Sequence, residues 1–135
     1  MPDASMPRAP RVLLRGEQTD GVLALVELTG GGRPPLHRHD FDETFYVLEG
    51  ELTFQLGDKR LTRRRGEVAF APRGVAHTYA NLSGESARAL LVCTPAGFEP
   101  YFDRIAAEVL GTGAPPAAAD SLPAVETLGP PMAEP

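Results

Sequence analysis

Short alternations of apolar and polar residues, each ended by glycine or proline, cover the chain from residue 11 to residue 95. The clearest is ELTFQL at 51–56, where every second residue is apolar, as in a strand with one buried face. Gly57 and Asp58 follow as a turn signal, and a return run begins at residue 60. This segment predicts a β-hairpin.

Other strand-sized runs recur about every ten residues, with Gly, Pro or Ser turn signals between them. These runs are rich in β-branched and aromatic residues, which are typical of strands. They lie at residues 11–15, 21–30, 37–39, 44–50, 67–72, 77–81 and 87–94. The pattern predicts an all-β fold, either an antiparallel sandwich or a barrel.

The two ends of the chain depart from this pattern. Residues 1–10 hold three prolines and no periodicity, which predicts a flexible N-terminal arm. Residues 96–111 place apolar side chains at helical spacing and end in glycine, which predicts a C-terminal helix. Residues 112–135 form a Pro/Ala-rich tail without aromatics, and composition alone predicts that it is disordered. The barrel is thus assigned to residues 11–95.

The overall charge narrows the possible partners. A net charge of −5 and a pI near 5.1 argue against nucleic acid and anionic membranes as binding partners.

Cys93 is the single cysteine, which excludes an internal disulfide and fits a reducing compartment. No apolar run approaches the roughly 20 residues of a membrane-spanning helix, and the first residues lack the apolar stretch of a signal peptide. We therefore expect a cytoplasmic protein.

All three histidines of the chain lie in two short segments. His37 and His39 are two residues apart, so on a strand they face the same side and can reach one point. Glu43 has the same parity, although the residues between can turn, and His77 must arrive from another strand. Three imidazoles and one carboxylate suit one divalent ion of Fe, Mn, Ni, Cu or Zn and leave coordination positions open, which indicates a catalytic site.

A histidine on a strand is more often a surface or hydrogen-bonded residue than a ligand, so a lone His-x-His pair would be weak support. The conjunction strengthens the metal interpretation, because every histidine of the chain lies in a segment bracketed by turn glycines. Asp40 and Asp42 are alternative ligands, but loop carboxylates are more often solvated.

The same residues satisfy two complete motifs. The first is G(X)5HXH(X)3–4E(X)6G, matched by Gly31, His37, His39, Glu43 and Gly50. The second is G(X)5PXG(X)2H(X)3N, matched by Gly66, Pro72, Gly74, His77 and Asn81. With these motifs the sequence resembles the cupin superfamily, and in particular small single-domain bacterial cupins of the quercetin-dioxygenase-like type. The resemblance implies a double-stranded β-helix (jelly-roll) barrel that holds one divalent metal.

The resemblance also implies a function. We expect a metal-dependent enzyme of small-molecule metabolism, first of all a quercetinase-like dioxygenase that acts on an enol or hydroxylated, including aromatic, substrate. Glu43 is assigned as the catalytic base in addition to its role as a ligand. Two alternatives remain: a cupin isomerase or decarboxylase that uses no O2, and a non-catalytic cupin that binds a small ligand.

Apolar and aromatic residues of the strands are candidates for the substrate pocket, with plain core as the alternative for each. These pocket candidates are Phe45, Val47, Phe54, Phe70 and Tyr79.

Two further expectations concern the periphery. The segment TPAGFEPYFDRIA with the later GPPM resembles the C-terminal extension of small cupins, so residues 97–131 are predicted to form a partial lid over the barrel mouth. The alternative is a helix that packs on the outer wall with a frayed tail. A homodimer is predicted, with the run at 11–15 adding across a partner as an edge strand.

Overall fold

The computed structural model describes residues 9–30, 33–111 and 124–132. Within these residues the elements are mostly short strands, as the alternation predicts. The strands are β1 (Arg11–Leu14), β2 (Ala24–Thr29), β3 (Pro35–His39), β4 (Asp42–Glu49), β5 (Glu51–Leu56), β6 (Lys59–Arg64), β7 (Val68–Ala71), β8 (His77–Ala80), β9 (Arg88–Thr94) and β10 (Val125–Pro131). The helices are a 3-10 turn η1 (Gly16–Gln18) and the α-helix α1 (Glu99–Leu110).

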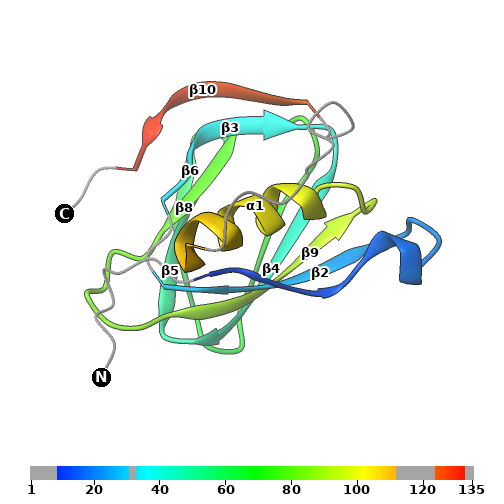
Figure 1. Ribbon diagram of the computed structural model, residues 1–135. Helices are drawn as coiled ribbons and strands as arrows, with labels where there is room; N and C mark the ends of the chain where they lie inside the picture. The colour runs from blue at the N-terminus through cyan, green and yellow to red at the C-terminus, as the bar shows by residue number, and fades with distance from the viewer. Residues whose placement is uncertain (1–8, 31–32, 112–123, 133–135) are drawn as a thin grey trace.

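In the described part of the chain the strands form two antiparallel sheets of five strands each. One sheet has the order β1-β2-β9-β4-β7 and the other β10-β3-β8-β5-β6. Figure 1 shows the helix α1 at the opening between them, with β3 and β10 on one side and β2 and β9 on the other. The predicted all-β jelly-roll class with a C-terminal helix is confirmed.

The core lies between the two sheets and follows from the alternation along each strand. Phe45 of β4 packs against Phe54 of β5 and Tyr79 of β8, with ring centroids 5.0 and 5.3 Å apart. Phe45 and Phe54 are 1% exposed. Burying a phenylalanine side chain contributes about 1.5–3 kcal/mol. These contacts join strands of both sheets and fix the sandwich.

Two motif glycines are required by backbone geometry. Gly50 turns the chain from β4 into β5 with φ of 72°, and a Cβ there would overlap the Ser86 carbonyl oxygen. Gly74 has φ of 80° and donates its backbone N–H to the His39 carbonyl at 2.8 Å. The second glycine therefore ties the loop before β8 to the strand that carries two of the histidines.

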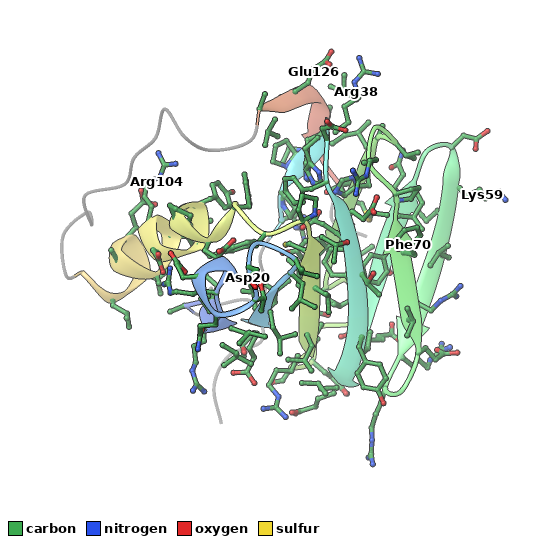
Figure 2. The ribbon with its side chains drawn as sticks, turned by 90° about the vertical axis from the view of Figure 1, so that its right-hand side faces the viewer. Asp20, Arg38, Lys59, Phe70, Arg104 and Glu126 are labelled. Carbon is green, nitrogen blue, oxygen red and sulfur yellow. The ribbon has the colours of Figure 1, made fainter. Side chains whose placement is uncertain are left out.

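The structure corrects the predictions made for the two ends of the chain. The predicted disorder of the tail is wrong for residues 124–132, because β10 pairs with β3, where it covers backbone groups that would otherwise be an open sheet edge. Arg38 and Glu126 form an ion pair across this pairing at 2.8 Å (Figure 2). Pro10 is buried, so the predicted arm ends before it. The remaining residues of the arm and tail, 1–8, 112–123 and 133–135, lie outside the described residues.

No helix in the described part of the chain has both the length and the apolar character needed to cross a membrane.

Candidate metal centre

The four predicted ligands come from three strands and both sheets. His37 and His39 lie on β3, and His77 lies on β8 directly opposite His37 in the antiparallel register. After His39 the chain bends at Asp40 and Phe41 and enters β4, which belongs to the other sheet. Glu43 therefore reaches the histidines from the facing sheet, which the parity of its position in the sequence left undetermined.

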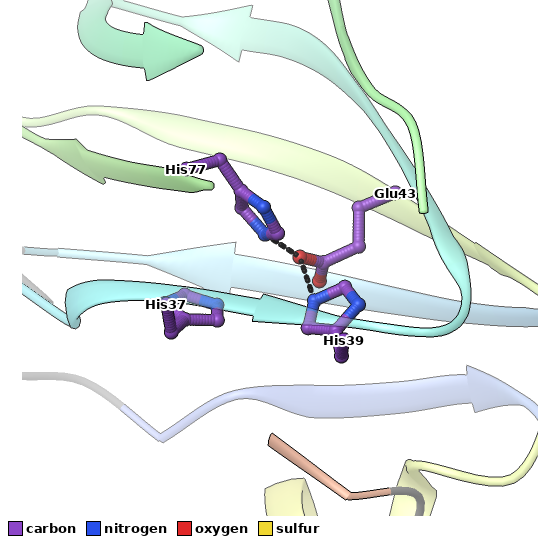
Figure 3. A group of neighbouring side chains, drawn as sticks. All are labelled: His37, His39, Glu43 and His77. Atoms are coloured by element: carbon purple, nitrogen blue, oxygen red, sulfur yellow. Dashed lines mark hydrogen bonds and ion pairs between the residues drawn. The ribbon is translucent and has the colours of Figure 1, made fainter. Parts of the chain in front are cut away.

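The four side chains meet at one point (Figure 3). One potential ligand atom from each residue lies within 4.8 Å of the others. The Glu43 Oε1 atom is 3.0 Å from His39 Nε2 and 2.7 Å from His77 Nε2. His39, Glu43 and His77 are buried, and His37 is half-buried. The described residues thus contain a compact cluster with the donor set of a metal site.

The outer nitrogens of the three rings fix their orientation. Each Nδ1 lies against a backbone carbonyl oxygen: Pro35 for His37 at 2.6 Å, Phe41 for His39 at 2.9 Å and Val75 for His77 at 2.9 Å. A carbonyl only accepts, so Nδ1 carries the proton and donates it. In a neutral ring, Nε2 then presents a lone pair to the centre, which is the arrangement of metal-bound histidine.

The protonation of the three rings decides whether a cation fits between the four side chains. With Nδ1 protonated, the Nε2 lone pairs of His39 and His77 and the Glu43 carboxylate all point at one another at hydrogen-bond distance. Lone pairs facing one another repel unless positive charge lies among them. The donor set therefore fits a divalent cation held by His37, His39, Glu43 and His77.

The ionisation of the cluster reflects the same geometry. Burial raises the pKa of Glu43, but the contacts with His39 and His77 outweigh burial and lower it to about 2. For His77, burial lowers the pKa and the Glu43 carboxylate more than compensates, so its pKa is raised. Burial lowers the pKa of His37, which favours the neutral ring that a metal requires.

Neighbouring residues support the cluster without joining it. The Phe41 ring stacks on His39 with centroids 3.7 Å apart and planes within 5°. Asp42, an alternative ligand in the sequence interpretation, instead forms an ion pair with Arg73 at 3.1 Å, and Asp40 is exposed. The bend between β3 and β4 thus holds the His39 ring in place, and neither aspartate belongs to the cluster.

A cavity of about 630 Å³ opens onto the cluster. His37, His39 and Glu43 line it, whereas His77 is not among its lining residues. The volume is within the range of pockets that hold small organic ligands. The cover of the cavity comes from α1, the N-cap residue before it, and β10, which contribute Phe98, Tyr101, Phe102, Ile105, Val125 and Thr127.

The structure separates the five pocket candidates. Tyr79 lines the cavity. Phe45, Val47 and Phe54 are at most 1% exposed and pack in the core instead. Phe70 is 50% exposed, because β7 turns Ala69 and Ala71 inward and leaves Phe70 on the outer face. Of the candidates, only Tyr79 is placed where it can touch a ligand.

The aromatic residues of α1 were missing from the expected pocket. Phe98, Tyr101 and Phe102 line the cavity and contact one another, with ring centroids 4.6 to 5.6 Å apart. Phe98 also lies 6.3 Å from the His39 ring, which brings the start of α1 close to the cluster of His37, His39, Glu43 and His77. The signal in the sequence was the apolar face of the predicted helix, but that face alone does not reveal which surface it covers.

Comparison with known proteins places the chain among related sequences and folds. It is 30% identical over 95 residues to quercetin 2,3-dioxygenase of Bacillus subtilis (strain 168), an alignment that covers 68% of this chain and 28% of the enzyme. The chain thus spans little more than a quarter of that relative's length.

Solved structures of other proteins share this fold. The polyketide cyclase RemF of Streptomyces resistomycificus superposes with a TM-score of 0.56 at 26% identity, over 68% of this chain and 71% of the cyclase. A cupin-like protein of Thermotoga maritima has the same fold, with a TM-score of 0.61 at 16% identity over 90% of this chain and 75% of that one. Residues 24–93, more than half of the chain, match the family Cupin_2 (Cupin domain), and the chain belongs to the cupin superfamily.

Proposed function

We propose that this chain is a metal-dependent cupin enzyme acting on an enol or hydroxylated aromatic small molecule, with a quercetinase-like dioxygenase as the first activity to test. One observation carries the proposal: three imidazole Nε2 atoms and the Glu43 carboxylate converge where an apolar, aromatic-lined cavity ends. The similarity to quercetin 2,3-dioxygenase supports the oxygenase assignment, although it covers only 28% of that enzyme.

His37, His39, Glu43 and His77 would hold one divalent cation, one of Fe, Mn, Ni, Cu or Zn. When bound, such a cation supplies Lewis acidity that lowers the pKa of a substrate hydroxyl. Because His37, His39 and Glu43 line the cavity while His77 does not, substrate approaches from the side of the first three residues.

Glu43 is the residue we assign as proton acceptor. A carboxylate at this position accepts a proton from a substrate hydroxyl once that hydroxyl has been acidified. Tyr79 is a second polar group in the cavity, and burial raises the pKa of its hydroxyl, which keeps it a hydrogen-bond donor.

The cover formed by α1 and β10 keeps water from the reacting atoms. Phe98 and Phe102 are at most 9% exposed and place aromatic rings over the cavity beside the cluster. An apolar cover strengthens electrostatic interactions within the site and protects reactive intermediates from water. We therefore propose that α1 and β10 act as the partial lid that the sequence predicts for residues 97–131.

A second candidate is a reaction that consumes no O2, in which the same residues activate a carbonyl for isomerisation, decarboxylation or cyclisation. The similarity to the polyketide cyclase RemF, at 26% identity over 71% of its length, favours this alternative. Simple binding of a small ligand is the third possibility. In that case the ligand would be recovered chemically unchanged after incubation with the protein.

Oxygen uptake distinguishes these functions. Protein loaded separately with Fe, Mn, Ni, Cu or Zn is incubated with quercetin and other enolic or phenolic compounds in an oxygen electrode, and the products are identified by mass spectrometry. The proposal predicts O2 uptake that depends on one or two of the metals and is lost in Glu43→Gln. Product formation without O2 uptake would instead support the second candidate.

We also propose a homodimer. In the described part of the chain β1 pairs only with β2, so it is an edge strand of its sheet, the kind of strand to which a partner strand can add. Light scattering at micromolar concentration is expected to give twice the mass of 14.4 kDa. A monomeric mass would exclude the dimer.

A further inference from the structure

The charges around the cavity run opposite to those of the whole chain. The net charge of the chain is −5. Yet the described residues that line the cavity include three arginines, Arg33, Arg88 and Arg104, and a single carboxylate, Glu43, which belongs to the metal cluster. A cavity wall with an excess of cations raises the local concentration of anionic ligands.

The three arginines differ in their partners. Arg88 forms ion pairs with Glu27 and Glu49 at 3.3 and 3.7 Å, so its charge is compensated within the barrel. Arg33 donates to the carbonyl of Met132, the residue that follows β10, at 3.1 Å. Arg104 of α1 has no ion pair or hydrogen bond with the described residues.

The surroundings of Arg104 do not supply a counter-charge. Its neighbour Asp103 is paired with Arg15 on another side of α1, and Glu108, one turn further on, makes no ion pair with it. Arg104 is half-buried and shares the cavity wall with Tyr101 and Ile105. A partly desolvated guanidinium without a carboxylate is unfavourable, and an anionic ligand would relieve this.

The helix sets Arg104 apart from the metal cluster. Phe98, immediately before α1, lies 6.3 Å from the His39 ring, and Arg104 follows six residues later. At 1.5 Å per residue this is about 9 Å along the helix axis. Figure 2 shows the Arg104 side chain extending from α1. A ligand that touches both the cluster and Arg104 must therefore carry its two polar groups at opposite ends.

We infer that Arg104 binds an anionic group of the substrate, so that the substrate class is a hydroxylated aromatic acid whose hydroxyl lies at the cluster and whose carboxylate lies at Arg104. The inference rests on the proposed function for the hydroxyl end only. Tyr101, three residues before Arg104 and also in the cavity wall, would lie beside the ring system between the two ends.

The test compares two probes that share one ring system. Metal-loaded protein is titrated under anaerobic conditions with 6-hydroxy-2-naphthoate and with 2-naphthol, and naphthalene fluorescence is followed. Because a hydrogen bond to a charged group contributes about 1.5–3 kcal/mol, wild-type protein should bind the naphthoate at least about tenfold more tightly. Arg104→Gln should remove this preference and leave 2-naphthol binding unchanged, while Arg104→Lys retains part of it.

Arg60→Gln is the matched control, because it removes the same charge from an exposed position on β6 outside the cavity wall. The inference is overturned if wild-type protein does not prefer the naphthoate, whether it binds both probes or neither, or if Arg60→Gln reduces the preference as much as Arg104→Gln. Since binding is measured without turnover, a protein that prefers the naphthoate but oxidises nothing refutes the oxygenase and leaves this inference standing.

Discussion

The cavity has two sides that are built differently. The barrel side, formed by β3, β4 and β8, carries the polar cluster, and every ring is fixed by a hydrogen bond to a backbone carbonyl. The cover, formed by α1 and β10, contributes aromatic and aliphatic side chains together with Arg104, which has no ion pair among the described residues. The contrast indicates that the barrel side determines the chemistry and the cover determines which molecules reach it. Substitutions on the two sides should therefore have separable effects.

The largest expected effect is on the barrel side. His77→Ala removes one of four converging ligand atoms but leaves the sheet contacts of β8 intact. Loss of residues that merely orient ligands costs about 10–100-fold in metal affinity, so loss of a ligand should cost at least about 100-fold. Elemental analysis and calorimetric titration measure this, and an unchanged thermal melt of the metal-free protein shows that the fold survives.

Asn81→Ala serves as the control for that variant, since Asn81 is also a motif residue. Its side chain accepts from Ser83 and donates to the Glu85 carbonyl, so it shapes a turn and not the cluster. It should lower stability by about 1 kcal/mol and leave metal content unchanged. Equal loss of metal in both variants would contradict the four-residue site.

On the cover, Phe102→Ala should affect the stability of the fold and not the binding of metal. Phe102 is 7% exposed and anchors α1 among Phe98 and Tyr101. Its removal should lower the free energy of unfolding by about 3 kcal/mol, the lower end for such truncations because the site already borders a cavity. Metal affinity should change little. Leu110→Ala, at a position 65% exposed on the same helix, should change stability by less than about 0.5 kcal/mol.

Truncation after Gly111 removes β10 and tests its share of the cover. The edge of β3 and the side of the cavity lined by Val125 and Thr127 would then open to solvent. We expect metal to be bound with little loss but to be released to a chelator severalfold faster. Stopped-flow mixing of loaded protein with EDTA measures the rate. An unchanged release rate would show that β10 is no part of the lid.

The smallest effect concerns the bend between β3 and β4, on the barrel side. Arg73 donates hydrogen bonds to Asp42 and lowers the pKa of that carboxyl below its ordinary value of 3.8. A lowered pKa in the folded state contributes stability above the ordinary value, and this contribution is lost as the pH falls through the folded-state pKa. Asp42→Asn should therefore be slightly less stable than wild type at pH 6, and the difference should vanish in acid.

Denaturant unfolding at a series of pH values measures this difference. Asp58→Asn, in the exposed turn after β5, is the control and should follow wild type at every pH. A difference between Asp42→Asn and wild type that grows in acid would contradict the assigned sign.

Much of the barrel could be read from the sequence because its signals are local. Alternation with period two predicted the hairpin of β5 and β6, and motif spacing selected His37, His39, Glu43 and His77, which the fold brings within 4.8 Å of one another. Two histidines two apart on a strand must share a face, whatever the tertiary structure. That they ligate a metal stays a prediction.

Where the local signal was ambiguous, only the tertiary structure decided. The segment of β7, VAFA, is apolar in both phases of the alternation, so period two could not say whether Phe70 or its alanine neighbours face inward. Register settled the question, because Ala69 lies opposite Phe45, whose side chain is in the core, and Phe70 therefore faces out.

The cover is the clearest case of a feature determined by the tertiary structure. The sequence predicted that α1 has an apolar face, but both the barrel mouth and the outer wall offer apolar surface to receive it. Likewise, nothing in the composition of residues 124–132 signals a strand, since proline and glycine disfavour one, yet the open edge of β3 gives their backbone a partner. Spacing within one strand is set by the chain itself, whereas contacts between distant segments depend on which surfaces the folded barrel leaves uncovered.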